Sequence, residues 1–159
     1  MSESLKGTLE TILVVDDNAL VLKVVSRIVE GANFCVLQAN NGAEAIALAK
    51  SVGNIDLLLS DVDMPVMTGP ELGQELKKTR KDMHVMLMSG GGIEGNLLVL
   101  NYGWAFIQKP ILNEKLVEMV SDVLHSKNRS QPGGHEYDSR KDDTCEKKKE
   151  PDSFSNESK

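Results

Sequence analysis

The sequence predicts an α/β fold in which a parallel sheet of five strands is covered by helices on both faces. Five short apolar runs of strand length alternate with segments whose apolar residues recur at helical spacing. Two of these runs, at residues 12–15 and 57–59, lack polar alternation, which is typical of strands buried on both faces. Both are followed closely by acids. Right-handed crossovers then place the carboxyl ends of all five strands on one edge of the sheet.

The first half of the chain is predicted to form two strands and two helices. The strands are residues 11–15 and 34–39, and the mixed polarity of the second favours a place near the sheet edge. Asn18 can cap the first helix, and Gly31 can stop it. Asn41 and Glu44 resemble a capping box for the second helix. The expected buried positions are Leu20, Val21, Val24, Val25, Ile28 and Val29 in the first helix, and Ala45, Ile46, Leu48 and Ala49 in the second.

The second half is predicted to supply three strands, at residues 55–60, 83–89 and 104–107. Pro70 stands where a helix begins, and Leu72 and Leu76 form the inward pair of that helix. Three glycines from Gly90 end the fourth strand, and a short helix is expected at residues 93–100. An amphipathic helix closes the domain, with its apolar positions at Leu116, Val117, Val120, Val123 and Leu124.

Length and composition bound the domain and exclude some classes of function. We expect a flexible segment at residues 1–10, one folded domain at residues 11–126 and a disordered tail at residues 127–159, which is too polar to bury a core. The tail carries equal numbers of basic and acidic residues, so the net charge of −6 belongs to the rest of the chain and argues against nucleic-acid binding. No apolar run approaches the roughly 18 residues of a membrane span, and no secretory signal is visible. A cytoplasmic location is expected.

Polar side chains gather at the predicted carboxyl edge of the sheet. Asp16, Asp17, Asp61, Ser89 and Lys109 all fall at or just after strand ends. Carboxylates that lie close together need a counter-charge, and oxygen ligands favour Mg²⁺. Asp61 is a candidate nucleophile toward phosphorus, because a carboxylate can form an acyl phosphate. The metal and Lys109 would neutralise phosphoryl charge while Ser89 donates a hydrogen bond, so the edge predicts phosphoryl transfer.

The motifs along this edge resemble those of the receiver domain of two-component response regulators. They are Val14-Val15-Asp16-Asp17-Asn18, Asp61-Val62-Asp63-Met64-Pro65 with Gly69, Met88-Ser89-Gly90, and Phe106-Ile107-Gln108-Lys109-Pro110. The resemblance covers about residues 10–126 and implies a flavodoxin-like, doubly wound (βα)5 sheet with strand order 2-1-3-4-5. The interval from Ser89 to Lys109 is shorter than the family usually has, as in receivers attached to hybrid kinases. Asp63 stands where the family often has Asn, which could change the lifetime of a phosphoryl group.

The resemblance implies a role for each residue of the edge. Asp61 corresponds to the phosphoacceptor and Lys109 to the phosphate-binding lysine, with a cis peptide bond expected before Pro110. Ser89 and Phe106 correspond to the switch hydroxyl and the switch aromatic. The implied Mg²⁺ ligands are Asp17 and Asp61 directly, Asp16 through water, and Asp63 through its backbone carbonyl.

The expected function is that of a single-domain response regulator, which is not an enzyme beyond its own phosphorylation and dephosphorylation. Asp61 would accept a phosphoryl group from a histidine kinase or a histidine phosphotransfer protein, and output would pass through contacts with a downstream protein. A phosphatase of the haloacid-dehalogenase type is an alternative, because Asp61-Val62-Asp63 matches its Asp-x-Asp motif, although the threonine expected after the motif is absent. A receiver fold that acts only as a scaffold is a further alternative, against which the intact Asp17, Asp61 and Lys109 argue.

Overall fold

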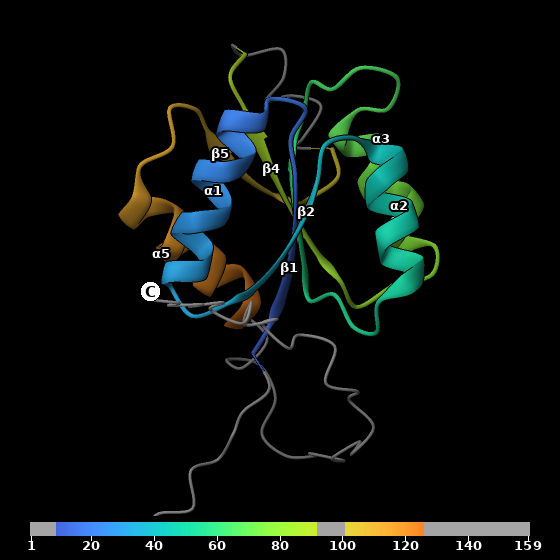
Figure 1. Cartoon of the computed structure of the whole chain (residues 1–159), viewed down its shortest axis with the longest axis horizontal. Helices are drawn as coiled ribbons and strands as arrows, with labels where there is room; N and C mark the ends of the chain where they lie inside the picture. The colour runs from blue at the N-terminus through green and yellow to red at the C-terminus, as the bar shows by residue number, and fades with distance from the viewer. Residues whose placement is uncertain (1–8, 92–100, 126–159) are drawn as a thin grey trace, which may run out of the picture.

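The computed structural model describes residues 9–91 and 101–125, and within them five strands form one parallel sheet in the order β2-β1-β3-β4-β5 (Figure 1). This confirms the predicted fold class and strand order. The elements are β1 (Thr11–Val15), α1 (Ala19–Gly31), β2 (Cys35–Ala39), α2 (Gly42–Ser51), β3 (Leu57–Asp61), α3 (Gly69–Lys77), β4 (His84–Ser89), β5 (Ala105–Gln108) and α5 (Asn113–His125).

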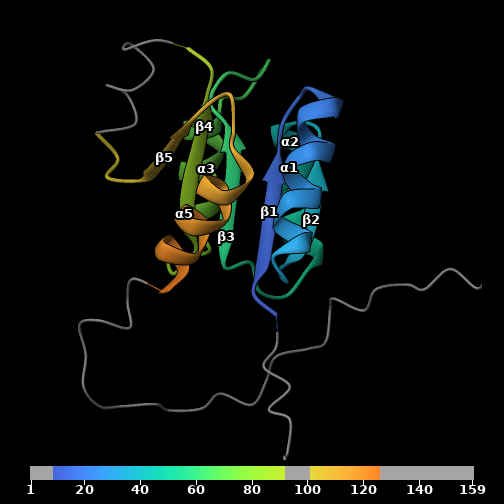
Figure 2. The ribbon, with the colours of Figure 1, turned by 90° about the vertical axis from the view of Figure 1, so that its left-hand side faces the viewer.

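Helices cover both faces of the sheet, with α1 and α5 on one side and α2 and α3 on the other (Figures 1 and 2). Alternate residues of each strand therefore enter two separate apolar clusters. Leu13 and Val15 of β1 join the cluster beneath α2 and α3, whereas Ile12 and Val14 join the one beneath α1 and α5. Every residue of β3 is buried, which explains the unbroken apolar run in its sequence.

Short polar side chains begin the helices. The Asn18 side chain accepts hydrogen bonds from the backbone N–H groups of Leu20 and Val21 at 3.0 and 3.2 Å, as its position predicts. Asn41 accepts from Glu44 N at 2.8 Å, but the Glu44 carboxylate accepts from Asn40 rather than returning to the cap, so only half of the expected capping box forms.

The third helix has a complete capping box, which the sequence analysis did not identify. Thr68 and Glu71 exchange hydrogen bonds, and Pro70 lies in the first turn as expected. The signal was present in the sequence as Thr-x-x-Glu.

The predicted apolar stripe of α1 is wrong in part. Leu20 and Val24 are 71% and 48% exposed, whereas Val25 and Val29 are buried as predicted, and Leu22 and Ser26 are buried in addition. The four buried residues follow the i, i+3, i+4, i+7 spacing of a single helix face. Apolar residues extend beyond one face of this helix, so periodicity alone selected a stripe that only partly overlaps the buried face.

Most element boundaries differ from the predictions by one or two residues. The clearest difference is in β3, which begins at Leu57 and includes Asp61 as its last residue, instead of ending at Ser60. The helix predicted at residues 93–100 lies outside the described residues, as do the predicted tail and most of the flexible N-terminal segment. Among the helices of the described part, none has the length and apolar content to cross a membrane.

Arg80, in the turn after α3, forms hydrogen bonds with the end of α2. Its guanidinium donates hydrogen bonds to the carbonyl oxygens of Gly53 at 2.7 Å and Val52 at 3.1 Å, and also to that of Ala49. The last carbonyls of a helix have no partner within the helix, so this cation satisfies them and complements the negative end of the helix dipole. The contact spans about thirty residues of sequence, and no local pattern predicts it.

Candidate functional site

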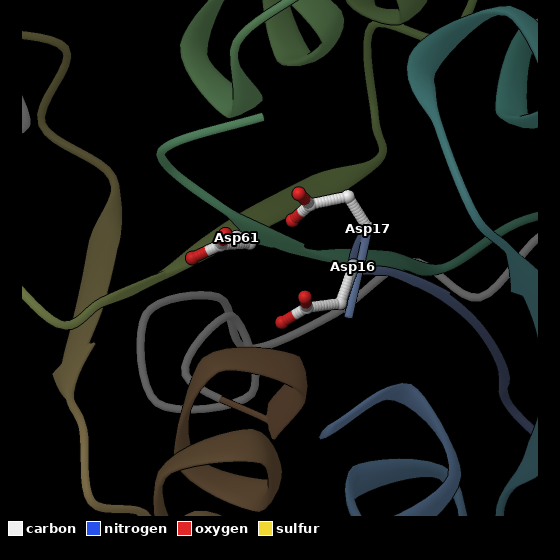
Figure 3. A group of neighbouring side chains, drawn as sticks. All are labelled: Asp16, Asp17 and Asp61. Carbon is white, nitrogen blue, oxygen red and sulfur yellow. The ribbon is translucent and has the colours of Figure 1, made fainter. Parts of the chain in front are cut away.

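Three carboxylates meet at the carboxyl edge of the sheet (Figure 3). Asp16 and Asp17 follow the last residue of β1, and Asp61 ends the neighbouring strand β3, where Val15 pairs with Ser60. Each side chain offers a carboxylate oxygen, and these oxygens lie within 4.8 Å of one another. Asp16 and Asp61 are buried while Asp17 is exposed, so the cluster opens to solvent on one side. The predicted convergence of these three residues is confirmed.

Asp16 is held at both of its carboxylate oxygens. Oδ1 accepts a hydrogen bond from Asn18 N at 2.9 Å, and Oδ2 accepts from Lys109 Nζ at 3.1 Å. The backbone N–H of Asp16 donates to Ala39 O of β2 at 3.3 Å. Asn18 therefore serves twice, as the cap of α1 and as a donor to a buried acid.

Lys109 connects the two buried acids. Its ammonium lies 3.1 Å from Asp16 Oδ2 and 3.1 Å from Asp61 Oδ1, and its backbone N–H donates to Ser89 O at 2.7 Å. The peptide bond between Lys109 and Pro110 is cis, as the resemblance implies. These contacts confirm that Lys109 belongs to the acidic edge, although it comes from a strand two places away from β3.

Burial and charge shift the protonation of this pair. Burial raises the pKa of Asp61 above its ordinary value, the charges of Asp16 and Asp17 raise it further, and the opposing effect of Lys109 is smaller than these together. Burial disfavours the charged form of Lys109, but the hydrogen bonds to Asp61 and Asp16 outweigh it and raise its pKa. One ammonium faces three carboxylates, so the edge has an excess of negative charge in which a further cation would be stabilised.

Ser89 presents a buried hydroxyl to this edge. Its side chain is fully buried, and its Oγ has no hydrogen-bond partner within the described residues. Buried hydroxyls are ordinarily satisfied, so Ser89 Oγ is a donor that the described residues leave available. A Cβ atom at Gly91 would lie 4.0 Å from Ser89 Oγ and 3.9 Å from Asp63 Oδ2, so the backbone after β4 passes close to both side chains.

Asp63 and Phe106 lie at the margins of the site. Asp63 is exposed, and its carboxylate is not one of the three that could share a metal ion in the described part of the chain. Phe106 is half-buried on β5, opposite Leu87 of β4, and packs against the cluster beneath α2 and α3. The roles that the resemblance assigns to both residues stay predictions.

Gly69 lets the loop after β3 fold back on the site. A Cβ atom at this position would lie 2.2 Å from the carbonyl oxygen of Asp61, which no other residue could tolerate without movement. The backbone N–H of Gly69 donates to Val62 O at 2.9 Å and fixes this close approach. The loop thus depends on a glycine where α3 begins.

The donor set fits a hard divalent cation. Carboxylate oxygens are the ligands that Mg²⁺ prefers, and an exposed member such as Asp17 leaves room for the waters that this ion keeps. The free Ser89 hydroxyl and the Lys109 ammonium add one donor and one charge suited to an anion beside the cation. The arrangement is suited to binding a phosphoryl group against Asp61.

Comparison with known proteins gives a consistent result. Residues 12–121 match the family model of the response regulator receiver domain. The chain is 31% identical over 123 residues to the sensor kinase CckA of Brucella abortus (strain 2308), spanning 76% of this chain and 13% of the kinase. It is 27% identical over 119 residues to the polar-differentiation response regulator DivK of Brucella anthropi, spanning 72% of this chain and 96% of that protein.

Solved structures of receiver domains are also similar to this chain. A CheY-like response regulator receiver domain protein from Methanospirillum hungatei JF-1 superposes with a TM-score of 0.70 at 28% identity, covering 78% of this chain and 100% of that one.

Proposed function

The chain belongs to the response regulator receiver domain family, and from this premise we propose that Asp61 accepts a phosphoryl group from a histidine kinase or a histidine phosphotransfer protein. The observation that supports this most directly is the placement of Lys109 Nζ at 3.1 Å from both Asp16 and Asp61, beside the three-carboxylate cluster. The chain spans 13% of the kinase CckA and 96% of the response regulator DivK. Relatives of such different length do not fix the phosphoryl donor or the downstream protein, so both belong to the proposal.

The chemistry proposed for Asp61 is an in-line displacement. A carboxylate oxygen attacks phosphorus while the bond to the donor's imidazole nitrogen breaks, and that nitrogen regains a proton. Asp61 Oδ1 already accepts from Lys109, which leaves Oδ2 for the attack. Lys109 then moves its hydrogen bond to a phosphoryl oxygen, and the Ser89 hydroxyl donates to another.

We propose Mg²⁺ as the cofactor, held by Asp17 and Asp61 directly, by Asp16 through water and by the backbone carbonyl of Asp63. When bound, the ion would neutralise charge shared by the phosphoryl oxygens and the carboxylates. Without it, Asp61 lies among carboxylates that raise its pKa and oppose the approach of a phosphate. Phosphorylation should therefore depend on the ion.

The response to phosphorylation is proposed to begin at Ser89. Its unpartnered hydroxyl can move to a phosphoryl oxygen, and Phe106, only half-buried on the edge strand, can follow into the space released. The output is a changed surface that a downstream protein binds. We propose a cytoplasmic location and no nucleic-acid contact for this module, and the family match does not favour the phosphatase alternative.

Intact-mass spectrometry tests the proposal. Incubation of the full chain with acetyl phosphate and Mg²⁺ should add one phosphoryl group per chain, and the adduct should disappear with EDTA and in Asp61→Asn. Asp82→Asn is the matched control, because Asp82 is an exposed acid beside the opposite end of β4. Absence of any adduct on the wild type would refute phosphorylation, and repeated turnover of an aryl phosphate would favour the phosphatase.

A further inference from the structure

Trp104 lies directly before the edge strand β5 and packs against α3. A Cβ atom at Gly73, in the middle of α3, would lie 2.9 Å from both Cη2 and Cζ3 of Trp104 and 3.3 Å from Cγ1 of Val85 on β4. The indole therefore occupies the space that a side chain at position 73 would need. Glycine inside a helix costs about 1 kcal/mol relative to alanine, so its presence at this position has a packing reason.

Tyr102 covers the indole on another side. The two rings are stacked with centroids 4.6 Å apart and planes 16° apart. Tyr102 is 36% exposed, and Trp104 is half-buried. The indole thus contacts both α3 and the Tyr102 ring, and a shift of β5 along its length changes the contact with α3.

The same strand links the indole to Lys109 of the acidic edge. Trp104 precedes β5, Phe106 lies two residues further on, and Lys109 follows the strand. Trp104 and Phe106 pack against one apolar cluster, so they share a face of the sheet. Five residues of extended chain span roughly 17 Å, so β5 is a short link with Lys109 at one end and the indole at the other.

This link is held to the rest of the sheet on one side. Within the described residues β5 pairs with β4 alone, from Ala105 opposite Met86 to Gln108 opposite Ser89. A four-residue edge strand has few hydrogen bonds that resist its displacement. A pull on Lys109 at one end of β5 can therefore move the strand and, with it, Trp104 at the other end.

We propose that Trp104 is a positioning residue that couples the acidic edge to α3, so that phosphorylation of Asp61 changes the surroundings of the indole and the protection of α3. The inference rests on the proposed phosphorylation of Asp61. When Lys109 moves from the carboxylates to a phosphoryl oxygen, β5 moves with it, and the indole wedged on Gly73 carries that movement to the helix. The result is a phosphorylation-dependent surface on the α3 side of the protein.

Trp104 is the single tryptophan of the chain, so its emission reports this contact directly. Beryllofluoride with Mg²⁺ should change the emission of the full-length wild type and leave that of Asp61→Asn unchanged. Gly73→Ala places a methyl group against the indole, and we expect its emission response to be at least about threefold smaller while it still takes up a phosphoryl group. Gly31→Ala is the matched control, because the added Cβ meets no described atom within 4 Å.

Hydrogen–deuterium exchange of α3 gives a second readout, which also serves if Gly73→Ala does not fold. Beryllofluoride should change exchange in peptides covering Gly69–Lys77 of the wild type, and Trp104→Phe should lose that change. If the indole were merely structural, Trp104→Phe would lower the stability of the protein and leave the change in α3 exchange intact. A wild type that gains the phosphoryl mass while emission and α3 exchange stay constant would overturn the coupling, as would equal responses in Gly73→Ala and Gly31→Ala. Absence of the phosphoryl mass itself would instead count against the proposed function.

Discussion

Replacing Lys109 with methionine should destabilise the protein and increase its stabilisation by Mg²⁺. The ammonium contacts two buried carboxylates at 3.1 Å each, and methionine keeps the length of the side chain without its charge. At an effective dielectric constant near 20, each contact contributes about 5 kcal/mol of Coulomb attraction before the cost of desolvation is subtracted.

Desolvation sets the net magnitude well below that figure. Removing one partner of a buried ion pair typically costs 3–5 kcal/mol, because the other charge stays buried without compensation. The Lys109 side chain is about a quarter exposed, so we expect the lower end, about 3 kcal/mol, or a fall in melting temperature of about 10 °C without added metal. Thermal unfolding in EDTA measures this, with the exposed Lys115→Met on α5 as the matched control.

Mg²⁺ should then restore part of the stability that Lys109→Met loses. With the ammonium gone, the carboxylates have a greater excess of negative charge, so they should bind the cation more tightly and the metal should raise the melting temperature of Lys109→Met more than that of the wild type. The same variant should lose most of its phosphorylation by acetyl phosphate. Equal melting temperatures for Lys109→Met and Lys115→Met in EDTA would refute the reasoning, because the ammonium would then carry no net stabilisation.

Alkaline pH tests the same Lys109 ion pair, and three substitutions test other parts of the structure. Because the folded-state pKa of Lys109 is raised, the stabilisation by its ammonium is fully present below the ordinary lysine pKa of 10.5 and is lost as pH rises through the folded-state pKa. The difference in melting temperature between the wild type and Lys109→Met should therefore become smaller at alkaline pH. Arg80→Met removes three hydrogen bonds to carbonyls at the end of α2 and should cost about 2–3 kcal/mol in urea unfolding, whereas exposed Lys81→Met should cost little. Ser26→Ala removes a fully buried hydroxyl that lacks a partner among the described residues and should raise the free energy of unfolding by about 1 kcal/mol; a fall would indicate a bonded hydroxyl. Val66→Asn should stabilise the protein by about 1 kcal/mol, because Val66 is a fully exposed β-branched residue at φ 70°, a conformation that asparagine adopts more readily. An unchanged midpoint of urea unfolding would argue against backbone strain at this position.

The sheet and its acidic edge were predictable because few alternatives fit the pattern. Apolar runs at β1 and β3 had to be buried on both faces, and parallel strands bring their carboxyl ends to one edge. Asp16 and Asp61 both stand at the carboxyl ends of these strands, so this rule brings them to the same edge. The placement of Lys109 followed from the same rule applied to β5.

The remaining features depended on packing that local sequence does not encode. Helix α1 offers apolar residues on more than one face, so only the fit against the sheet decided that Leu22 is buried and Leu20 exposed. Two contacts join residues far apart in the chain: the hydrogen bonds of Arg80 to the end of α2, and the packing of Trp104 against Gly73. Arginine, tryptophan and glycine each have many commoner roles, so the residue types alone do not predict these contacts. Such contacts appear only when the backbone is in place.

The site also depends on the small size of the residues at the end of β4. Lys109 follows β5, whereas Asp61 ends β3, and β4 lies between them. Neighbouring strands are about 4.8 Å apart, so the lysine side chain must pass over the end of β4 to reach the acid. The residues at that end are Ser89 and Gly90, and a Cβ atom at Gly90 would lie 3.7 Å from Lys109 Cδ, already in van der Waals contact. The lysine side chain therefore runs alongside Gly90 at ordinary contact distance, and the strand between Lys109 and the carboxylates ends in two small residues beside which it passes.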